Sequence, residues 1–259
     1  MNSITFLGTG GGRYIILSQR RYSGGIWLDF GAKIVLDPGP GALIRALQFH
    51  REINKLDAVL VSHNHLDHYN DAEVMIEAMT GGMKKKRGAL VTTPQTLAYI
   101  SGYHKSAVEV ITPKPNEKFK IEDIRVEALP TCKHENALGF KFFTKEGVVC
   151  YASDTDYSKE LVRNYMDSKI LILNVIFPKG RGIETHLNTD KALKIVKQAK
   201  PELAIINHFG VQMLNSNPDN EARYIEDESG VRTIAAKDGM TLNLEELDKV
   251  EKQIKLSGF

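Results

Sequence analysis

Cysteine, tryptophan and long apolar runs are scarce in this chain of 259 residues. Its two cysteines, Cys132 and Cys150, are too few for a disulfide framework, which excludes the small disulfide-stabilised secreted folds. No apolar run approaches the roughly 20 residues of a membrane-spanning helix, so we expect no membrane partner. The opening residues MNSITFLGTG lack the charged start and apolar stretch of a secretory signal, and with the scarcity of cysteine they favour the cytoplasm.

The chain also lacks a strong net charge of either sign. It has 34 Lys and Arg against 32 Asp and Glu, which gives a net charge of +2. This balance provides no overall field for a polyanion, so composition neither requires nor excludes nucleic acid. The loop-like segment TGGMKKKRG has four consecutive cations: Lys84, Lys85, Lys86 and Arg87. The preferred interpretation of these cations is a solvated loop, and the alternative is a patch that binds an anionic substrate or RNA.

The remaining composition is that of a globular protein, with 42% apolar and 25% charged residues. The length suffices for one large domain or two small ones, and we interpret residues 1–259 as a single domain. Strand patterns dominate early and helical patterns intervene, and the apolar stretch LDAVLVS predicts a strand buried on both faces. This order fits an α/β fold of two mixed sheets packed face to face with helices outside, although composition equally permits a doubly wound sheet.

Local spacing predicts several further elements. The stretch ALIRALQFHREI has helical spacing that puts Leu47 and Ile53 on one apolar stripe. Asp71 is a candidate N-cap for a helix that continues to Met79. The stretch VRTIAAKDGMTLNL predicts one last strand, and a polar helix is expected after it at the C-terminus.

The stretch VLVSHNHLDHYND carries three histidines and an aspartate where an apolar strand ends. Side chains two residues apart leave a strand on the same side, so His63 and His65 can reach one ion. Leu66 is expected to point into the core, while Asp67 and His68 diverge toward a second position. Imidazole and carboxylate together suit a pair of divalent ions about 3.5–4 Å apart. The alternative is that these are surface histidines, but that leaves their close spacing after a buried strand unexplained.

The segment SHNHLDH resembles the signature of the metallo-β-lactamase superfamily. GTGGG and LDPGPG precede it, and PTCKHE, YASDTDYS and IINHFG follow it, in the order expected of that superfamily. The resemblance implies a four-layer αβ/βα sandwich of two mixed β-sheets with flanking helices, and a metal site at one edge between the sheets. It also implies a metal-dependent hydrolase, and because many members are dimers, a homodimer.

The same resemblance implies a ligand in each motif and two divalent ions, with Zn²⁺ as the first expectation and Mn²⁺ or iron as alternatives. The implied ligands are His63, His65 and His134 for one ion, Asp67, His68 and His208 for the other, and Asp154 as a bridge. Asp37 is expected to orient a ligand histidine through its ring N–H. The residues ASDT around Asp154 also fit a helix N-cap, and both roles are compatible.

Two ions at such a site would lower the pKa of a water molecule and neutralise charge on a phosphate or acyl oxygen, and Asp67 could accept the proton of that water. His186 in GIETHLN resembles an H-x-[ST/N] element of the superfamily's phosphodiesterases, which include tRNase Z and phosphoribosyl cyclic phosphate phosphodiesterase. That resemblance implies contact with the scissile phosphate, or protonation of the leaving oxygen. The alternative is a surface histidine in a loop.

The sequence departs from tRNase Z in two ways. Asn174 lies in LILNVIFPK, where tRNase Z members carry a His-Glu pair, and no long arm for gripping tRNA is evident. We therefore favour a small phosphorylated substrate, a cyclic or nucleotide-type phosphodiester, over nucleic acid. Three alternatives stay open: a thioester or lactone hydrolase on the same site, a tRNA- or RNA-processing endonuclease, and a non-catalytic metal-stabilised binding module.

Overall fold

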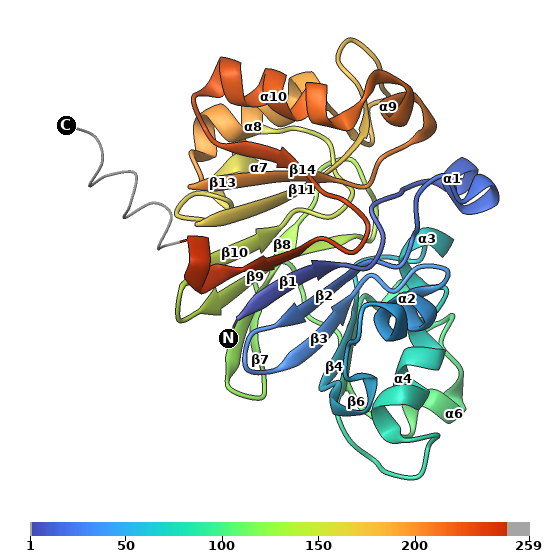
Figure 1. The fold of residues 1–259 in the computed structure, drawn as a ribbon. Helices are drawn as coiled ribbons and strands as arrows, with labels where there is room; N and C mark the ends of the chain where they lie inside the picture. Colours follow the sequence, from blue (N-terminus) through green and yellow to red (C-terminus); the bar gives the residue numbers. More distant parts are fainter. Residues whose placement is uncertain (1, 248–259) are drawn as a thin grey trace.

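Two mixed β-sheets lie face to face at the centre of the computed structural model, which describes residues 2–247 (Figure 1). The first sheet has the strand order β15-β1-β2-β3-β4-β5-β6. Its strands are β1 Ser3–Phe6, β2 Ile26–Asp29, β3 Lys33–Leu36, β4 Ala58–Val61, β5 Ala89–Thr92, β6 Glu109–Ile111 and β15 Thr241–Asn243. Strands β15 to β3 pair antiparallel, and strands β3 to β6 pair parallel.

The second sheet has the strand order β14-β13-β11-β10-β9-β8-β7, with β12 paired to β11 beside this path. Its strands are β7 Lys118–Ile121, β8 Ile124–Pro130, β9 Leu138–Thr144, β10 Gly147–Tyr151, β11 Ile170–Phe177, β12 Leu187–Asn188, β13 Leu203–Asn207 and β14 Thr233–Ala235. Strands β7 to β10 pair antiparallel, and β10, β11, β13 and β14 pair parallel.

Helices cover the outer face of each sheet, as Figure 1 shows. Those near the first sheet are α1 Arg13–Ser18, α2 Ala42–Gln48, α3 Leu66–Tyr69, α4 Ala72–Thr80, α5 Pro94–Leu97 and α6 Gly102–Lys105, with the 3₁₀ helix η1 Ile53–Lys55. Those near the second sheet are α7 Lys159–Arg163, α8 Thr189–Ala199, α9 Val211–Ser216 and α10 Pro218–Ser229. None of the helices within residues 2–247 is long and apolar enough to cross a membrane.

Three apolar layers hold the sheets and helices together. The middle layer lies between the sheets, with Leu28 of β2 and Phe140 of β9 in one buried cluster. Trp27 points to the opposite face of β2, where it packs with Ile76 of α4. Successive residues of a strand face opposite sides, so a strand covered on both sides is apolar throughout, as β4 is. The expected four-layer sandwich of two mixed sheets with flanking helices is confirmed.

The last strand was predicted as one element and is two. β14 lies at the edge of the second sheet and pairs with β13, whereas β15 extends the first sheet beside β1. The turn between them contains Gly239, whose φ of +80° suits glycine, and this turn carries the chain from one sheet to the other. The polar C-terminal helix predicted from the sequence falls mostly outside the described residues.

Two predictions around α2 are also wrong in detail. α2 ends at Gln48 and Ile53 belongs to η1, so Leu47 and Ile53 do not lie on one apolar stripe of a single helix. Leu47 is 53% exposed. Asp71 precedes α4, but its side chain does not cap that helix. Its Oδ2 instead accepts hydrogen bonds from the backbone N–H groups of Gly41 (3.1 Å) and Leu43 (3.4 Å) at the start of α2.

Candidate metal centre

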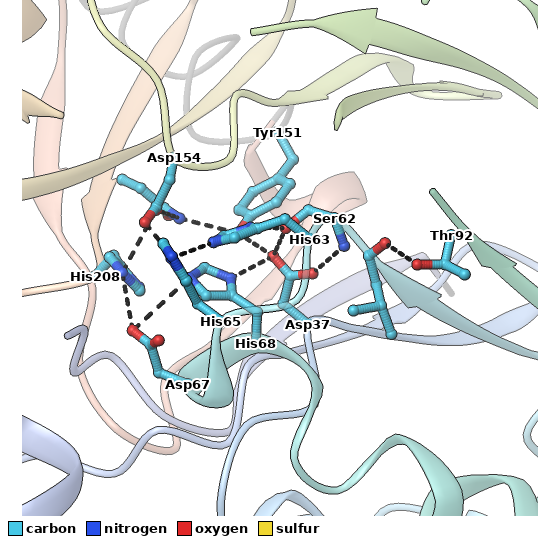
Figure 2. A network of polar contacts seen from close by, with 12 residues as sticks. Asp37, Ser62, His63, His65, Asp67, His68, Thr92, Tyr151, Asp154 and His208 are labelled. Carbon is cyan, nitrogen blue, oxygen red and sulfur yellow. Dashed lines mark hydrogen bonds and ion pairs between the residues drawn. The ribbon is translucent and has the colours of Figure 1, made fainter. Parts of the chain in front are cut away.

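Many of the side chains singled out in the sequence gather at the edge where the strands of both sheets end, and Figure 2 labels Asp37, His63, His65, Asp67, His68, Asp154 and His208 there. After β4 the chain presents His63 and His65, whose Nε2 and Nδ1 atoms lie 2.9 Å apart. The next turn is helical rather than extended, and this short helix, α3, carries Asp67 and His68 to a neighbouring position. Leu66 is 55% exposed, so the prediction that it anchors this turn in the core is wrong.

The second sheet contributes from its strand ends. Asp154 follows β10 and His208 follows β13, and these strands run parallel with β11 between them. The carboxyl ends of parallel strands lie at the same edge of a sheet, so residues 54 positions apart in the sequence meet there. His134 comes from the loop after β8, and its ring centroid lies 4.6 Å from that of His63.

The ligand atoms form two groups, and within each group they lie within 4.8 Å of one another. The groups are His63, His65, His134 and Asp154, and Asp67, His68 and His208. Asp154 also reaches the second group, because its Oδ1 lies 3.4 Å from His208 Nε2 and its Oδ2 3.6 Å from His68 Nε2. The structure thus brings together all seven residues expected as ligands, with Asp154 between the two groups.

Three imidazole nitrogens in these groups are buried without a hydrogen-bond partner among the described residues: His68 Nε2, His134 Nε2 and His208 Nε2. An unpaired buried polar atom costs about 1–3 kcal/mol, so folded proteins rarely keep several in one place. Imidazole nitrogen and carboxylate oxygen are donors that zinc accepts. The residues therefore fit a pair of divalent ions, which would occupy the unsatisfied positions.

Burial holds three of the imidazoles in the neutral form. It lowers the pKa of His63 well below its ordinary value, lowers that of His65, and lowers the pKa of His134 to about 4. A neutral ring keeps the lone pair that a metal ion needs, so this group is ready for an ion at neutral pH. Burial also disfavours charge on His68, but nearby carboxylates, Asp154 first, outweigh it and raise the pKa of His68 well above its ordinary value.

Burial and neighbouring charges also act on the pKa of Asp154, but in the opposite directions because its charged form is negative. Burial alone would raise the pKa of this carboxyl, but His208 and His68 outweigh burial and hold the pKa well below its usual range. The carboxylate therefore stays charged between the two groups of ligands.

Asp37 lies behind the ligands and accepts four hydrogen bonds. Its Oδ1 accepts from the backbone N–H of Ser62 (2.6 Å), and its Oδ2 from Ser62 Oγ (2.7 Å), Tyr151 Oη (2.6 Å) and His68 Nδ1 (2.9 Å). In the neutral form of His68 that a metal ion would bind, Nδ1 donates to Asp37 and the other nitrogen, Nε2, is the acceptor facing the site. The structure thus places Asp37 in contact with a ligand histidine, where it was expected.

Two contributors to this arrangement were not predicted. Asn174 Nδ2 donates to Asp154 Oδ1 (2.8 Å) and to Tyr151 Oη (3.0 Å), and Tyr151 in turn donates to Asp37. A chain of hydrogen bonds therefore joins Asp154 to His68 through three side chains. The signal was present in the sequence, because Asn174 is a lone polar residue inside the apolar strand ILILNVIF and a buried amide needs partners.

The glycine-rich loop after β1 closes over the second group of ligands. The backbone N–H of Gly12 donates to Asp67 Oδ2 at 2.5 Å. A Cβ atom on Gly11 would lie 2.3–2.4 Å from the ring of His208, so no other residue fits there without moving that ring. Burial would raise the pKa of Asp67, but His68 and His208 outweigh it and lower the pKa. The backbone of the GTGGG segment thus forms one wall of the candidate site.

His186 lies inside the site and not on the open surface. Its Nε2 is 3.2 Å from Asp154 Oδ2, its ring centroid is 5.1 Å from that of His134, and only 15% of its side chain is exposed. Its Nδ1 contacts Thr185 Oγ1 at 2.8 Å. This placement leaves one ring nitrogen directed at the candidate metal centre.

A cleft of about 620 Å³ opens beside His134. Its lining combines apolar, hydroxyl, amide and charged side chains of both signs, including Thr93, Gln95, Pro130, Lys114, Lys133, Glu135 and Asn136. The basic loop lies elsewhere, since Gly88 precedes β5 at the end of the sheet opposite His63. Arg87 there pairs with Asp57 at 2.9 Å, so this cation supports the fold.

Comparisons with known proteins agree with this geometry. Residues 32–209 match the family model of the beta-lactamase superfamily domain. The chain is 34% identical over 254 residues to the uncharacterized protein MJ1374 of Methanocaldococcus jannaschii, which covers 93% of this chain and 94% of that protein. It is 28% identical over 247 residues to human zinc phosphodiesterase ELAC protein 2, which covers 80% of this chain but 29% of that longer protein.

Solved structures share the fold at low sequence identity. The metallo-beta-lactamase fold protein YhfI from Bacillus subtilis superposes with a TM-score of 0.79 at 19% identity, covering 93% of this chain and 98% of that one. A diphosphatase from the PhnP family superposes with a TM-score of 0.71 at 19% identity, covering 94% and 98%. The family match, the fold and the clustered histidines and aspartates agree, and the chain belongs to the metallo-β-lactamase superfamily.

Proposed function

We propose that the protein is a metal-dependent phosphodiesterase that hydrolyses small phosphodiesters of the cyclic or nucleotide type. The observation that carries this proposal is the position of His186, whose Nε2 lies 3.2 Å from Asp154 Oδ2 and whose ring centroid lies 5.1 Å from that of His134. An imidazole in that place can donate a proton or a hydrogen bond to an oxygen of a phosphodiester held at the ions. Human zinc phosphodiesterase ELAC protein 2 supports the same reaction class.

Two divalent ions fit the donor atoms, and Zn²⁺ is favoured because five of the seven candidate ligands are imidazoles. We assign one ion to His63, His65 and His134, the other to Asp67, His68 and His208, and the bridge to Asp154. When bound, the ions supply a nucleophile at neutral pH and stabilise negative charge on the phosphoryl oxygens.

The side chains supply the proton transfers. The carboxylate of Asp67 takes a proton from the attacking water, whose oxygen forms the new bond to phosphorus. The bond from phosphorus to the leaving oxygen breaks, and Nε2 of His186 gives that oxygen a proton, so the products are a phosphate monoester and an alcohol. Hydrogen bonds to Gly12 and Asp37 hold Asp67 and His68 in place during these steps.

The size of the cleft favours a small substrate. A volume of about 620 Å³ beside His134 suits a nucleotide-sized molecule. The likeness to a diphosphatase from the PhnP family is in keeping with such a substrate. Lys84, Lys85 and Lys86 lie in the loop before β5, at the other end of the sheet, and do not line this cleft.

The direct test compares zinc- or manganese-loaded protein on bis(p-nitrophenyl) phosphate, a thioester and a lactone. We expect cleavage of the phosphodiester and, on a phosphodiester whose alkyl leaving alcohol needs a proton, a loss of about 100- to 10,000-fold in kcat for His186→Ala at unchanged metal content. His104→Ala is the matched control, because His104 pairs with Glu73 and Glu77 away from the site. Thioester turnover that survives His186→Ala, with no phosphodiester cleavage, would instead establish an acyl hydrolase.

A further inference from the structure

The segment that carries His186 is held by one lysine of the following helix. Residues 178–186 connect β11 to β12 without regular secondary structure. Lys191 of α8 directs its ammonium back at this segment and donates to the carbonyl oxygens of Ile183 and His186, both at 3.0 Å. We propose that Lys191, anchored by Asp156, is a positioning residue for His186. The inference deepens the proposed function and rests on it.

Asp156 provides the third partner of the ammonium. Its Oδ1 lies 2.6 Å from Lys191 Nζ, and its side chain is only 6% exposed. A lysine ammonium has three protons, so Asp156 and the two carbonyls use all of them and fix the position of the group. A buried carboxylate gives a stronger, less screened interaction than a surface pair.

The same carboxylate reaches a second loop of the site. Asp156 Oδ2 lies 3.5 Å from Nζ of Lys133, the residue before His134, and Lys133 also contacts Glu184 at 3.0 Å. Asp156 itself comes two residues after Asp154. The cluster Lys133–Asp156–Lys191 therefore links the segments of a candidate ligand, the candidate bridge and His186.

Helix stability does not explain a lysine at position 191. Lys191 lies in the first turn of α8, which begins at Thr189 after the N-cap Asn188, and a cation there opposes the helix dipole. The helix is rigidly seated, since Thr189 and Ala192 are fully buried. Helical side chains lean toward the helix N-terminus, which aims this ammonium at the preceding loop. Lys191 is therefore better placed to hold the preceding loop than to stabilise the helix.

The test replaces Lys191 by Met and compares two phosphodiesters. One has a p-nitrophenolate leaving group, which needs no proton, and the other an alkyl alcohol, which does. We expect kcat to fall at least about 10-fold for the alkyl ester and less than about threefold for the p-nitrophenyl ester, with little change in KM. Lys191→Arg should recover part of the loss, because a guanidinium can donate to the same carbonyls.

A double variant separates positioning from a general structural effect. If Lys191 acts through His186, then Lys191→Met adds little further loss in a His186→Ala background. The matched control is Lys197→Met on the same helix, whose ammonium pairs with Glu228 at the surface. Equal losses on both esters, or a full additional loss in the His186→Ala background, would overturn the proposal.

A second readout needs neither metal nor activity. Arg181 is exposed in the segment that Lys191 holds, so trypsin reports how firmly the segment is fixed. In metal-free protein we expect Lys191→Met, and more weakly Asp156→Asn, to speed cleavage after Arg181, while Lys197→Met does not. Unchanged cleavage in both variants would refute the proposal that Lys191 and Asp156 hold the segment of His186, even if the wild-type protein cleaves no phosphodiester. Failure of this proposal and failure of the proposed function can therefore be told apart.

Discussion

Tyr151 and Asn174 lie outside the two groups of candidate ligands but are hydrogen-bonded to residues of the candidate metal centre. Burial, with the charge of Asp37 second, raises the pKa of Tyr151 well above its ordinary value, so its hydroxyl stays protonated and remains a donor to Asp37. Asp37 in turn fixes the ring of His68. Partners of this kind commonly contribute 10- to 100-fold to metal affinity, as an order of magnitude.

Tyr151→Phe removes one hydroxyl from this chain and leaves the aromatic ring. We expect the free energy of unfolding to fall by about 1–3 kcal/mol, because Asn174 and Asp37 each lose a buried partner. We also expect zinc affinity to fall by about 10-fold or more. Denaturant titration and calorimetric zinc binding measure the two effects.

Tyr157→Phe is the matched control for that variant. Its hydroxyl accepts a hydrogen bond from Gln198 Nε2 at an exposed position, 2.9 Å away. The loss there should stay within about 0.5 kcal/mol, with unchanged zinc affinity. Equal zinc affinity for Tyr151→Phe and the wild type would show that the chain from Asp154 to His68 has no influence on the ions.

Among the elements, the loop between β1 and α1 has a strict requirement for glycine at Gly11. It passes so close to His208 that a side chain at Gly11 overlaps the imidazole ring. The loop is held from both sides, since Gly11 N–H donates to the Phe209 carbonyl (3.1 Å) and the Thr9 carbonyl accepts from Phe209 N–H (2.8 Å). Because the loop is held in this way, a side chain at Gly11 has to displace the His208 ring.

Gly11→Ala tests this element. The added methyl group should displace the His208 ring and weaken binding of one of the two ions by about 10-fold or more, while the other ion is retained. Competition titration with a chromophoric chelator resolves the two affinities. Gly102→Ala is the control, because nothing lies within 4 Å of a Cβ placed there. Two unchanged affinities in Gly11→Ala would contradict the contact.

Local motifs explain why much of the site could be predicted from the sequence. His63, His65, Asp67 and His68 follow one buried strand, and a ligand at the end of such a strand is recognisable without tertiary information. Contacts between residues distant in the chain were not predictable in this way. The hydrogen bond from Tyr151 to Asp37 spans 114 residues and joins the two sheets, and no local pattern encodes it.

For the whole molecule, the two sheets must be correctly packed before the ligands meet. The first sheet supplies the candidate ligands after β4, and the second supplies those after β8, β10 and β13. β15 adds to this coupling, because the chain crosses from β14 in one sheet to pair with β1 in the other. The sequence pattern predicted both sheets, but the split of the last strand depends on edge pairing that periodicity does not reveal.

The stability of the metal-free protein should therefore depend on pH through the buried histidines. His63, His65 and His134 have lowered pKa values in the fold, that of His134 being about 4, against about 6.5 in the unfolded chain. Between those values the unfolded chain binds more protons, so stability is complete above about pH 6.5 and is lost as pH falls. His68, with its raised pKa, acts in the opposite direction: its contribution to stability is complete below about pH 6.5 and is lost as pH rises above that value, so it offsets part of the gain from the other three histidines.

We expect urea denaturation of metal-free protein to give a free energy of unfolding about 2 kcal/mol lower at about pH 5 than at about pH 7. His134→Gln should reduce this difference, because one of the groups that must stay neutral is removed. Equal or greater stability at the lower pH would mean that these rings are not held neutral in the fold.

The central claim is that seven side chains from both sheets bind two ions, and anomalous X-ray scattering at the zinc edge tests it most directly. Crystals of zinc-supplied protein should show two peaks, one among His63, His65 and His134 and the other among Asp67, His68 and His208, with Asp154 between them. A single peak elsewhere, or no peak among these side chains at saturating zinc, would contradict it.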